Sequence, residues 1–317
     1  MKHSNTNRLS IAILLVLLAA AGVSGCGAGE GGASESSLSA TSQADEVPVL
    51  VSTDWVAEHK DDADVLLVHV AMLEMAPPEA FIPGAVVLDY HAIETSEGLA
   101  IELPDPQQLV AVFRAAGVSN DNHVVLYGGG AAHISARAFV TLEYLGHPRV
   151  SVMDGGIGAW ISDGRPTSDI PADANAGDFV AKINEDILAD AEWIQARLED
   201  PNVAVIDARP ADQYAGYSNR GLREGHIPGA GNLYFVELLQ SEEVPRLKPR
   251  DEVEALFAAA GAGPDKTVVS YCQIGMRASY NYLIARHLGY DVKFYDQSWQ
   301  EWGGREDLPA ETGSGGD

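Results

Sequence analysis

The chain has 317 residues, a length that suits two domains, because each half is long enough to bury a core of its own. It carries 20 lysine and arginine residues against 46 aspartate and glutamate residues, a formal net charge of -26. Such an acidic surface disfavours nucleic-acid binding, since it repels phosphates. We interpret the acidity as a solvated surface and expect no metal site, because no group of His, Cys, Asp and Glu has metal-ligand spacing.

The first 26 residues have the pattern of an export signal. A basic start is followed by an apolar run over residues 11–22, which is short for a helix crossing ~30 Å of hydrocarbon. The run ends in Val23-Ser24-Gly25-Cys26, which resembles the lipobox of bacterial lipoproteins, whose cysteine is lipidated and begins the mature chain. We therefore expect a lipoprotein signal over residues 1–26 and a flexible tether, rich in Gly, Ser and Ala, over residues 27–46. We expect the protein to be exported and anchored to a membrane through Cys26, facing the periplasm or the cell exterior. The alternative is that Cys26 is an unmodified cysteine in an ordinary signal region.

Two nearly collinear copies of one unit make up the rest of the chain. Phe81-Ile82-Pro83-Gly84-Ala85 recurs as His226-Ile227-Pro228-Gly229-Ala230. Val124-Val125-Leu126-Tyr127 recurs as Val268-Val269-Ser270-Tyr271. Two repeats of this length indicate duplicated domains rather than a solenoid.

Each copy alternates short β-branched runs with helix-like stretches, a pattern typical of a parallel sheet flanked by helices. In the first copy Asp105, followed by a proline, predicts the start of a helix, and Gly117 predicts its end. We expect an α/β fold with an N-terminal domain over residues 47–165, a linker over 166–182 and a C-terminal domain over 183–310.

Cys272 is the one cysteine besides Cys26, so an internal disulfide is not expected in a lipidated mature chain. It lies between a β-type run over residues 267–271 and a helix-like stretch that begins at Ala278. Backbone N–H groups and the positive end of the helix dipole favour thiolate over thiol at such a position, and Arg277 adds a positive charge. We expect Cys272 to be a nucleophile; the alternative is an inert cysteine at the end of a core strand.

The loop Cys272-Gln273-Ile274-Gly275-Met276-Arg277 is one residue shorter than the loop that wraps a phosphate in cysteine-dependent phosphatases. Together with Asp207-Ala208-Arg209 and Gly225-His226-Ile227-Pro228-Gly229-Ala230, it resembles the rhodanese family of sulfurtransferases. The resemblance implies two tandem rhodanese-like domains and a thiosulfate sulfurtransferase. Cys272 would take the sulfane sulfur of thiosulfate as a persulfide, release sulfite and pass the sulfur to cyanide or a thiol, with no cofactor.

The same resemblance assigns roles within the loop. The N–H groups of residues 273–278 would stabilise the thiolate and the persulfide anion. Gly275 would permit a backbone angle or a close approach that a side chain blocks, while Gln273, Ile274 and Met276 line the loop. Arg277 would either bind the sulfonate oxygens of the donor or tie the loop to an acidic partner, and the sequence leaves both open.

Four residues outside the loop are supporting candidates. Asp207 and Arg209 are expected to form a buried pair that braces the loop rather than touching substrate. His226 is expected to make a structural hydrogen bond in the turn before Pro228, and Arg223 to add positive charge from a neighbouring loop.

The first copy lacks the chemical groups of this site, as in tandem rhodaneses whose N-terminal domain is catalytically silent. Its counterparts of Cys272, Arg277, Asp207 and Arg209 are Gly128, His133, His69 and Ala71. A phosphate-binding role for the glycines at 128–130 would need a Lys, Ser or Thr that the loop lacks.

The sequence defines the sulfur donor less clearly than it defines the nucleophile. Gln213 stands before Tyr214, where eukaryotic-type tandem members that bind thiosulfate or mercaptopyruvate carry an Arg. The loop also differs from the Cys-Gly-Ser-Gly type of mercaptopyruvate enzymes, which favours thiosulfate. A 3-mercaptopyruvate sulfurtransferase and a tethered persulfide carrier with little turnover remain the alternatives.

Overall fold

The computed structural model describes residues 47–218 and 221–313. The predicted signal, the predicted tether and Cys26 lie outside these residues. In the described part of the chain, no helix has the length and apolar character needed to cross a membrane.

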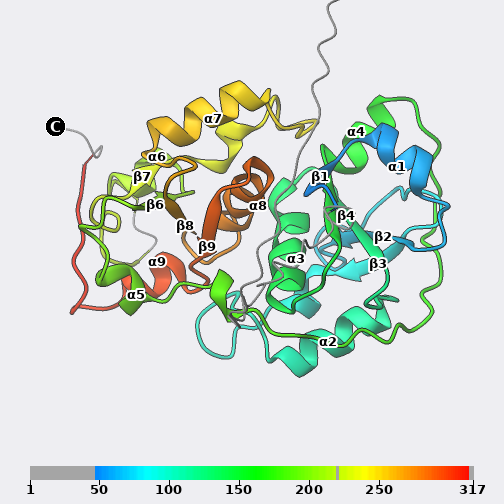
Figure 1. The fold of residues 1–317 in the computed structure, drawn as a ribbon, viewed down its shortest axis with the longest axis horizontal. Coiled ribbons are helices and arrows are strands. Elements are labelled where there is room, and N and C mark those ends of the chain that lie inside the picture. Colours follow the sequence, from blue (N-terminus) through cyan, green and yellow to red (C-terminus); the bar gives the residue numbers. More distant parts are fainter. Residues whose placement is uncertain (1–46, 219–220, 314–317) are drawn as a thin grey trace, which may run out of the picture. The chain divides into compact units, whose positions relative to one another are not determined.

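The N-terminal domain is built on a five-stranded sheet with the strand order β1-β5-β4-β2-β3, in which every neighbouring pair is parallel (Figure 1). Its elements in chain order are β1 (Leu50–Val51), α1 (Thr53–His59), β2 (Val65–Ala71), β3 (Val86–Asp89), the 3-10 helix η1 (Tyr90–Ile93), α2 (Pro106–Ala115), β4 (His123–Gly128), α3 (Ala132–Tyr144), β5 (Val150–Met153) and α4 (Gly156–Ser162). The predicted helix ends are confirmed: the Asp105 carboxylate accepts a hydrogen bond from Gln107 N at 2.8 Å, and Gly117 has φ 91° just after α2.

The C-terminal domain repeats the design with a four-stranded sheet in the order β7-β6-β8-β9, again with parallel neighbours throughout. Its elements are η2 (Glu185–Ile187), α5 (Ala191–Gln195), β6 (Val203–Asp207), α6 (Ala211–Tyr214), β7 (Gly231–Asn232), η3 (Phe235–Leu238), α7 (Arg250–Ala259), β8 (Thr267–Tyr271), α8 (Ala278–Leu288), β9 (Asp291–Phe294) and α9 (Ser298–Trp302). The expected pair of α/β domains with parallel sheets is therefore confirmed.

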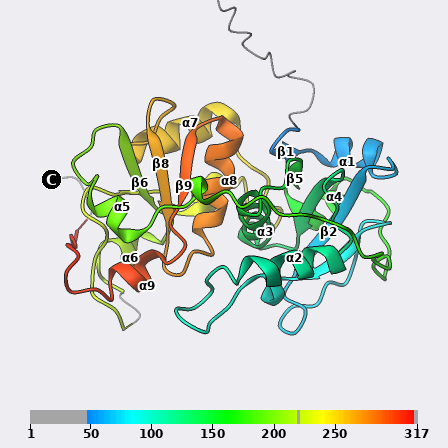
Figure 2. The same ribbon diagram turned by 60° about the horizontal axis from the view of Figure 1, so that its bottom comes forward.

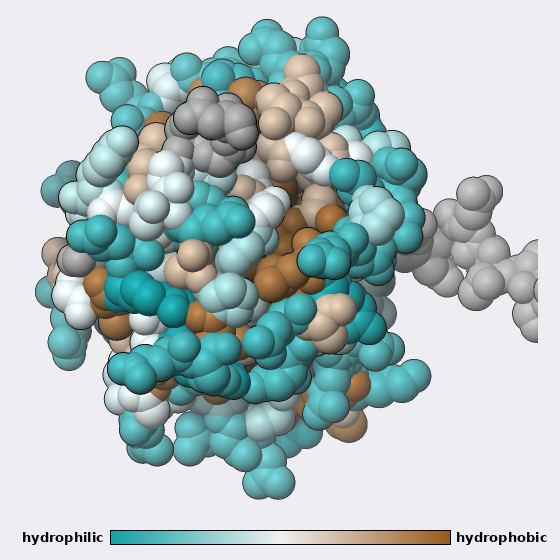
Figure 3. Space-filling view, turned by 90° about the vertical axis from the view of Figure 1, so that its left-hand side faces the viewer, coloured by the Kyte–Doolittle hydropathy of each residue, from teal (hydrophilic) through white to brown (hydrophobic). Residues whose placement is uncertain are grey.

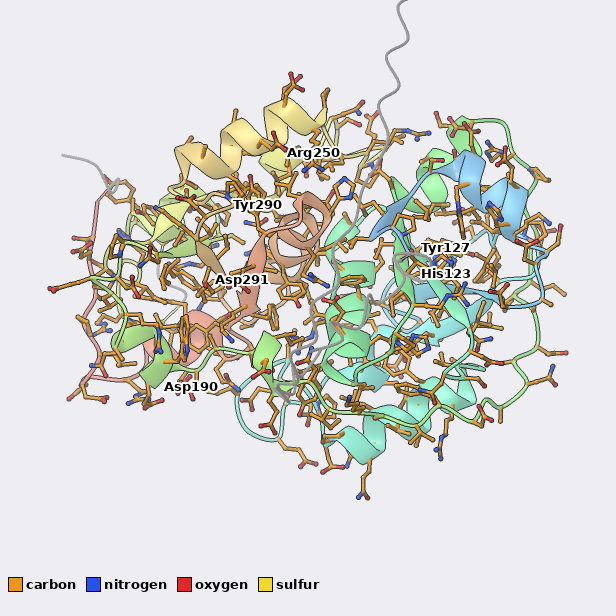
Figure 4. The ribbon with its side chains drawn as sticks, in the orientation of Figure 1. His123, Tyr127, Asp190, Arg250, Tyr290 and Asp291 are labelled. Carbon is orange, nitrogen blue, oxygen red and sulfur yellow. The ribbon has the colours of Figure 1, made fainter. Side chains whose placement is uncertain are left out.

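A matching contact in the two domains shows the duplication at atomic detail. The Tyr127 hydroxyl, at the end of β4 (Figure 4), accepts a hydrogen bond from Ile82 N at 3.0 Å. The Tyr271 hydroxyl, at the end of β8, accepts one from Ile227 N at 3.2 Å. In each domain the turn of the Ile-Pro-Gly-Ala repeat is thus fixed to the strand that leads into the loop of interest.

The two domains pack through α3 and α8, which lie side by side in both ribbon views (Figures 1 and 2). At this contact the Tyr282 hydroxyl donates to Glu143 Oε2 at 2.8 Å, and Arg286 Nη2 donates to Glu143 Oε1 at 2.9 Å. Because α8 begins directly after the Cys272 loop, the N-terminal domain supports that loop from the side of α3.

The segment expected as a linker, residues 166–182, runs along the N-terminal domain. Ser168 pairs with Phe81 in an isolated antiparallel bridge, and Phe179 N donates to Val118 O at 3.1 Å. Phe179 is fully buried. The segment therefore contributes to the core of the N-terminal domain.

The face of the C-terminal domain shown in Figure 3 is mainly hydrophilic, with small apolar areas between polar ones. This surface is consistent with the interpretation of the acidic residues as solvated. No group of three or more His, Cys, Asp and Glu among the described residues could hold a metal ion.

Candidate active site

Cys272 is the first residue after β8, at the carboxyl edge of the sheet, where ligands of open parallel sheets bind. Its side chain is almost fully buried, with the residue 1% exposed. Its backbone N–H donates to Ser298 Oγ at 3.2 Å, and its carbonyl accepts from Trp299 N at 3.0 Å. The start of the loop is thus tied to the start of α9.

Ser298 makes this connection from a strained backbone position. Its φ is 55°, in the left-handed region that non-glycine residues rarely adopt. Its hydroxyl donates to Tyr295 O at 2.9 Å while it accepts from Cys272 N. Sequence reasoning missed Ser298, although its counterpart in the N-terminal domain, Gly156, gave a signal: a glycine there, with φ 57°, marks a position that needs this conformation.

The loop presents six consecutive amide groups that are not used elsewhere. None of the N–H groups of residues 273–278 donates a hydrogen bond to another atom in the described part of the protein. The last of them open α8, whose dipole adds to their positive potential. Rows of free backbone donors of this kind are suited to binding an anion.

Gly275 holds the middle of the loop and has φ 78°. A Cβ atom here would lie 2.7 Å from the carbonyl oxygen of Asp296, a separation that real side chains do not tolerate. Its own carbonyl accepts from Ser279 Oγ at 3.0 Å. Both the turn and the close approach therefore require glycine.

The remaining loop side chains differ in burial. Gln273 is 9% exposed, and its carbonyl accepts from Gln300 N at 3.0 Å. Ile274 and Met276 are half-buried, and Met276 packs against the main core.

Arg277 occupies the N-cap position of α8 and is half-buried. Its guanidinium makes no hydrogen bond or ion pair with any described residue, so the acidic partner considered above is not found there. Arg277 also acts on His133 of the N-terminal domain. Burial, and to a lesser extent the positive charge of Arg277, lower the pKa of His133 to about 4. This histidine is therefore neutral at pH 7. Arg277 is thus a cation available to an incoming anion.

Asp207 and Arg209 form a buried ion pair behind the loop. Arg209 Nη2 lies 2.6 Å from Asp207 Oδ2, and Arg209 also donates to Gly225 O at 2.8 Å. The guanidinium carbon lies 4.7 Å from the ring centre of Trp299, the residue whose N–H holds the Cys272 carbonyl. The pair therefore contacts the loop through Trp299 rather than directly.

His226 and Arg223 are engaged with the backbone. His226 Nδ1 donates to Tyr214 O at 2.9 Å, and its ring stacks on the Tyr214 ring at 3.7 Å between centres. Arg223 donates to Leu308 O at 2.7 Å and to Trp302 O at 3.2 Å. Both residues hold the turns that surround the site.

Besides Ser298, the structure adds three residues that the sequence patterns did not single out: Arg137, Asp296 and Tyr90. Arg137 on α3 is fully buried and pairs with Asp296 Oδ1 at 2.5 Å, directly beside Gly275. Tyr90 is also fully buried, and its hydroxyl has no partner among the described residues. Burial raises the pKa of Tyr90, Arg137 opposes this rise, and the nearby Glu94, Cys272 and Asp296 add to it. The N-terminal domain thus places a cation and a hydroxyl close to the Cys272 loop.

Fold and site together define a two-domain α/β protein in which the second copy carries the Cys272 loop and the first copy packs beside it. Comparisons with known proteins agree with this description. The family model of the rhodanese-like domain matches twice, over residues 52–163 and 190–305.

Several curated relatives match nearly their whole length. The chain is 32% identical to a 3-mercaptopyruvate sulfurtransferase of Escherichia coli K12 over 82% of this chain and 97% of the relative. It is 32% identical to a putative thiosulfate sulfurtransferase of Mycobacterium leprae over 84% of this chain and 98% of the relative. Among solved structures, the 3-mercaptopyruvate sulfurtransferase SseA of Escherichia coli superposes with a TM-score of 0.70 and 29% identity, over 80% of this chain and 99% of that chain. The chain belongs to the rhodanese family of sulfurtransferases.

Proposed function

We propose that this protein is a thiosulfate sulfurtransferase in which Cys272 carries the transferred sulfur. The observation that carries the proposal is the row of six amides, residues 273–278, that follows the buried thiol and donates no hydrogen bond to any described residue. A buried anion without donors is costly, whereas one that receives several hydrogen bonds is stable. This loop is suited to hold sulfur as an anion, first as thiolate and then as persulfide.

The reaction consists of two displacements at sulfur. The Cys272 thiolate attacks the outer, sulfane sulfur of thiosulfate and forms a new S–S bond. The bond between that sulfur and the sulfonate breaks, and sulfite leaves with the electron pair. A nucleophilic acceptor, cyanide or a thiolate, then attacks the outer sulfur of the persulfide and returns the electron pair to Cys272 as thiolate.

Arg277 supports thiosulfate as the donor. Its guanidinium is half-buried at the start of α8 and has no acidic partner among the described residues. Guanidinium binds the planar array of oxygens of a sulfonate or carboxylate well. We assign to it the oxygens of the donor, and to Asp207 and Arg209 the bracing of the loop through Trp299.

A second donor, 3-mercaptopyruvate, is favoured by the name of the Escherichia coli relative. The loop argues against it, because Cys272-Gln273-Ile274-Gly275 differs from the Cys-Gly-Ser-Gly type of mercaptopyruvate enzymes. A third function is a persulfide carrier, which needs the same loop but little turnover.

Steady-state assays with both donors distinguish these functions. Sulfite release from thiosulfate, with cyanide or dithiothreitol as acceptor, is compared with pyruvate release from 3-mercaptopyruvate. We expect kcat/KM to be at least about tenfold higher with thiosulfate, a difference of ~1.4 kcal/mol in transition-state binding. The opposite ratio would make the protein a mercaptopyruvate enzyme, and one sulfur bound per chain without turnover would make it a carrier.

We also propose that the protein is exported and anchored through lipid on Cys26. The proposal rests on the Val23-Ser24-Gly25-Cys26 pattern after a short apolar run. Replacing Cys26 by Ser should move the protein out of the membrane fraction of its native host, and a Cys26→Ser protein found wholly in that fraction would refute the anchor.

A further inference from the structure

The N-terminal domain contains a cavity of about 380 Å³ at the carboxyl ends of β2 and β4. It occupies the place in this domain that corresponds to the site behind the Cys272 loop. Its walls are mainly apolar and include Ala71, Ile134, Ile157 and Ile161, together with the backbone of Gly130.

The cavity exists because three bulky or charged groups of the C-terminal domain have smaller or different counterparts. Ile157 stands where Trp299 stands in the C-terminal domain. The alignment is fixed by two identical pairs on either side, Asp154 with Asp296 and Trp160 with Trp302. In the same way Ala71 replaces Arg209 and His69 replaces Asp207. In the C-terminal domain the Arg209 guanidinium fills this space against the Trp299 ring at 4.7 Å, whereas the N-terminal domain leaves it empty of side chains.

One buried polar side chain lines the cavity. His69 is 1% exposed, and neither of its ring nitrogens makes a hydrogen bond in the described part of the chain. Its ring is fixed between Phe81, at 5.4 Å between ring centres, and Tyr127, at 4.5 Å. Buried polar atoms in native proteins nearly always have a partner, and a neutral imidazole offers one donor and one acceptor.

The charges around the cavity disfavour anionic ligands, and its apolar walls disfavour any ligand whose charge would be buried there. Burial lowers the pKa of His69 to about 4, so the ring is uncharged at pH 7. Glu79, exposed at the rim, is the charged residue among those that line the cavity, and it repels anions. Thiosulfate and other anionic sulfur donors are therefore poor ligands here.

We propose that this cavity binds an uncharged, largely apolar small molecule whose single hydrogen-bonding group pairs with His69. The cavity volume lies within the range of small-molecule sites, and its apolar walls with one placed polar group are the usual composition of such sites. The inference does not depend on the chemistry proposed for Cys272.

The site is tested with phenol as the probe. Toluene, which lacks the hydroxyl group, and benzoate, which carries a negative charge, serve as the comparison compounds. Each is titrated into full-length protein labelled at isoleucine methyl groups, and the methyl shifts of Ile157 and Ile161 are followed by NMR. We expect saturable shifts with phenol, and at least tenfold weaker binding of toluene and of benzoate. Toluene binding equal to phenol, benzoate binding equal to phenol, or no shift with phenol up to its solubility limit would each overturn the proposal.

Two variants and a matched control locate the binding. Ala71→Phe fills the cavity, because Ala71 lines it on the same face of β2 as His69 and stands where Arg209 stands in the C-terminal domain. It should abolish the phenol shifts, whereas Ala259→Phe, on the exposed side of α7, should leave them unchanged. His69→Phe should remove the advantage of phenol over toluene. Circular dichroism and the unfolding midpoint establish that each variant is folded; phenol binding retained by folded Ala71→Phe would contradict the proposal.

Discussion

The Cys272 thiol is almost completely buried, so its reactivity depends on the groups that meet it inside the loop. The Cys272 N–H donates to Ser298 and its carbonyl accepts from Trp299, while the amides of residues 273–278 donate to no described residue. Arg277 is the loop cation, and it has no acidic partner among the described residues. In the proposed mechanism, the Arg277 side chain binds the anionic donor and the loop backbone stabilises the sulfur anion.

Replacing Arg277 by Ala should therefore act mainly on donor binding. We expect KM for thiosulfate to rise by one to two orders of magnitude, roughly 1.4–3 kcal/mol, with a smaller fall in kcat. Arg277→Lys should restore part of the loss, because the charge returns without the planar fork. An unchanged KM in Arg277→Ala, measured by sulfite release at saturating cyanide, would remove Arg277 from the donor site.

At the scale of the loop and its neighbouring elements, Gly275 allows the turn to fit under Asp296. Gly275→Ala should lose most activity, because the new Cβ would meet Asp296 O at 2.7 Å and displace the loop. The expected cost in the free energy of unfolding is roughly 1–3 kcal/mol. Gly261→Ala is the matched control: Gly261 also has a positive φ, 84°, but nothing lies within 4 Å of the place that its Cβ would take. Equal activity losses in the two variants would show that backbone strain alone, and not the fit under Asp296, limits the loop.

The corresponding element of the N-terminal domain, the end of β4, has room for a cysteine. A Cβ on Gly128 would lie 3.4 Å from Val70 O, a tolerable contact. We expect Gly128→Cys to be alkylated by iodoacetamide yet to give no sulfur transfer in a Cys272→Ser background, because His133 stands in place of Arg277 and Ala71 in place of Arg209. Rescue of sulfite release by Gly128→Cys would show that the N-terminal domain is a competent site lacking only sulfur.

The sequence predicted those parts of the site that lie in one continuous segment or in a repeat. The strand before Cys272, the helix after it and the Asp207-Ala208-Arg209 segment were all recognisable, because their patterns are local. Arg137 and Tyr90 were missed since they reach the loop from the other domain, through the packing of α3 on α8. Asp296 follows β9, and nothing in its sequence neighbourhood shows that it pairs with Arg137.

At the scale of the whole molecule, several buried histidines make stability depend on pH. Burial lowers the pKa of His69, His123 and His133 to about 4 in the folded state, against ~6.5 when unfolded. Between these values the unfolded chain binds more protons, so the free energy of unfolding is highest above pH 6.5 and falls as pH drops toward 4. Each histidine contributes a loss of about 1.4 kcal/mol between pH 7.5 and 5.5.

Urea unfolding at pH 7.5 and 5.5 measures this dependence. In His69→Phe the stability difference between the two pH values should shrink by about 1.4 kcal/mol, because this ring no longer titrates. Ala259→Phe, on the exposed side of α7, removes no titratable group and should behave like the wild type. An unchanged difference in His69→Phe would mean that His69 is not held neutral by the fold.

The central claim, that Cys272 carries sulfur as a persulfide, is tested most directly by intact-protein mass spectrometry after incubation with thiosulfate. Wild-type protein should gain the mass of one sulfur atom, located on the peptide that contains Cys272, and should lose it when cyanide is added. Cys272→Ser should gain nothing and should release no sulfite, because a serine hydroxyl stays protonated and forms no persulfide. A wild-type protein that turns over thiosulfate without gaining sulfur, or a Cys272→Ser protein that keeps a tenth of wild-type turnover, would contradict the account.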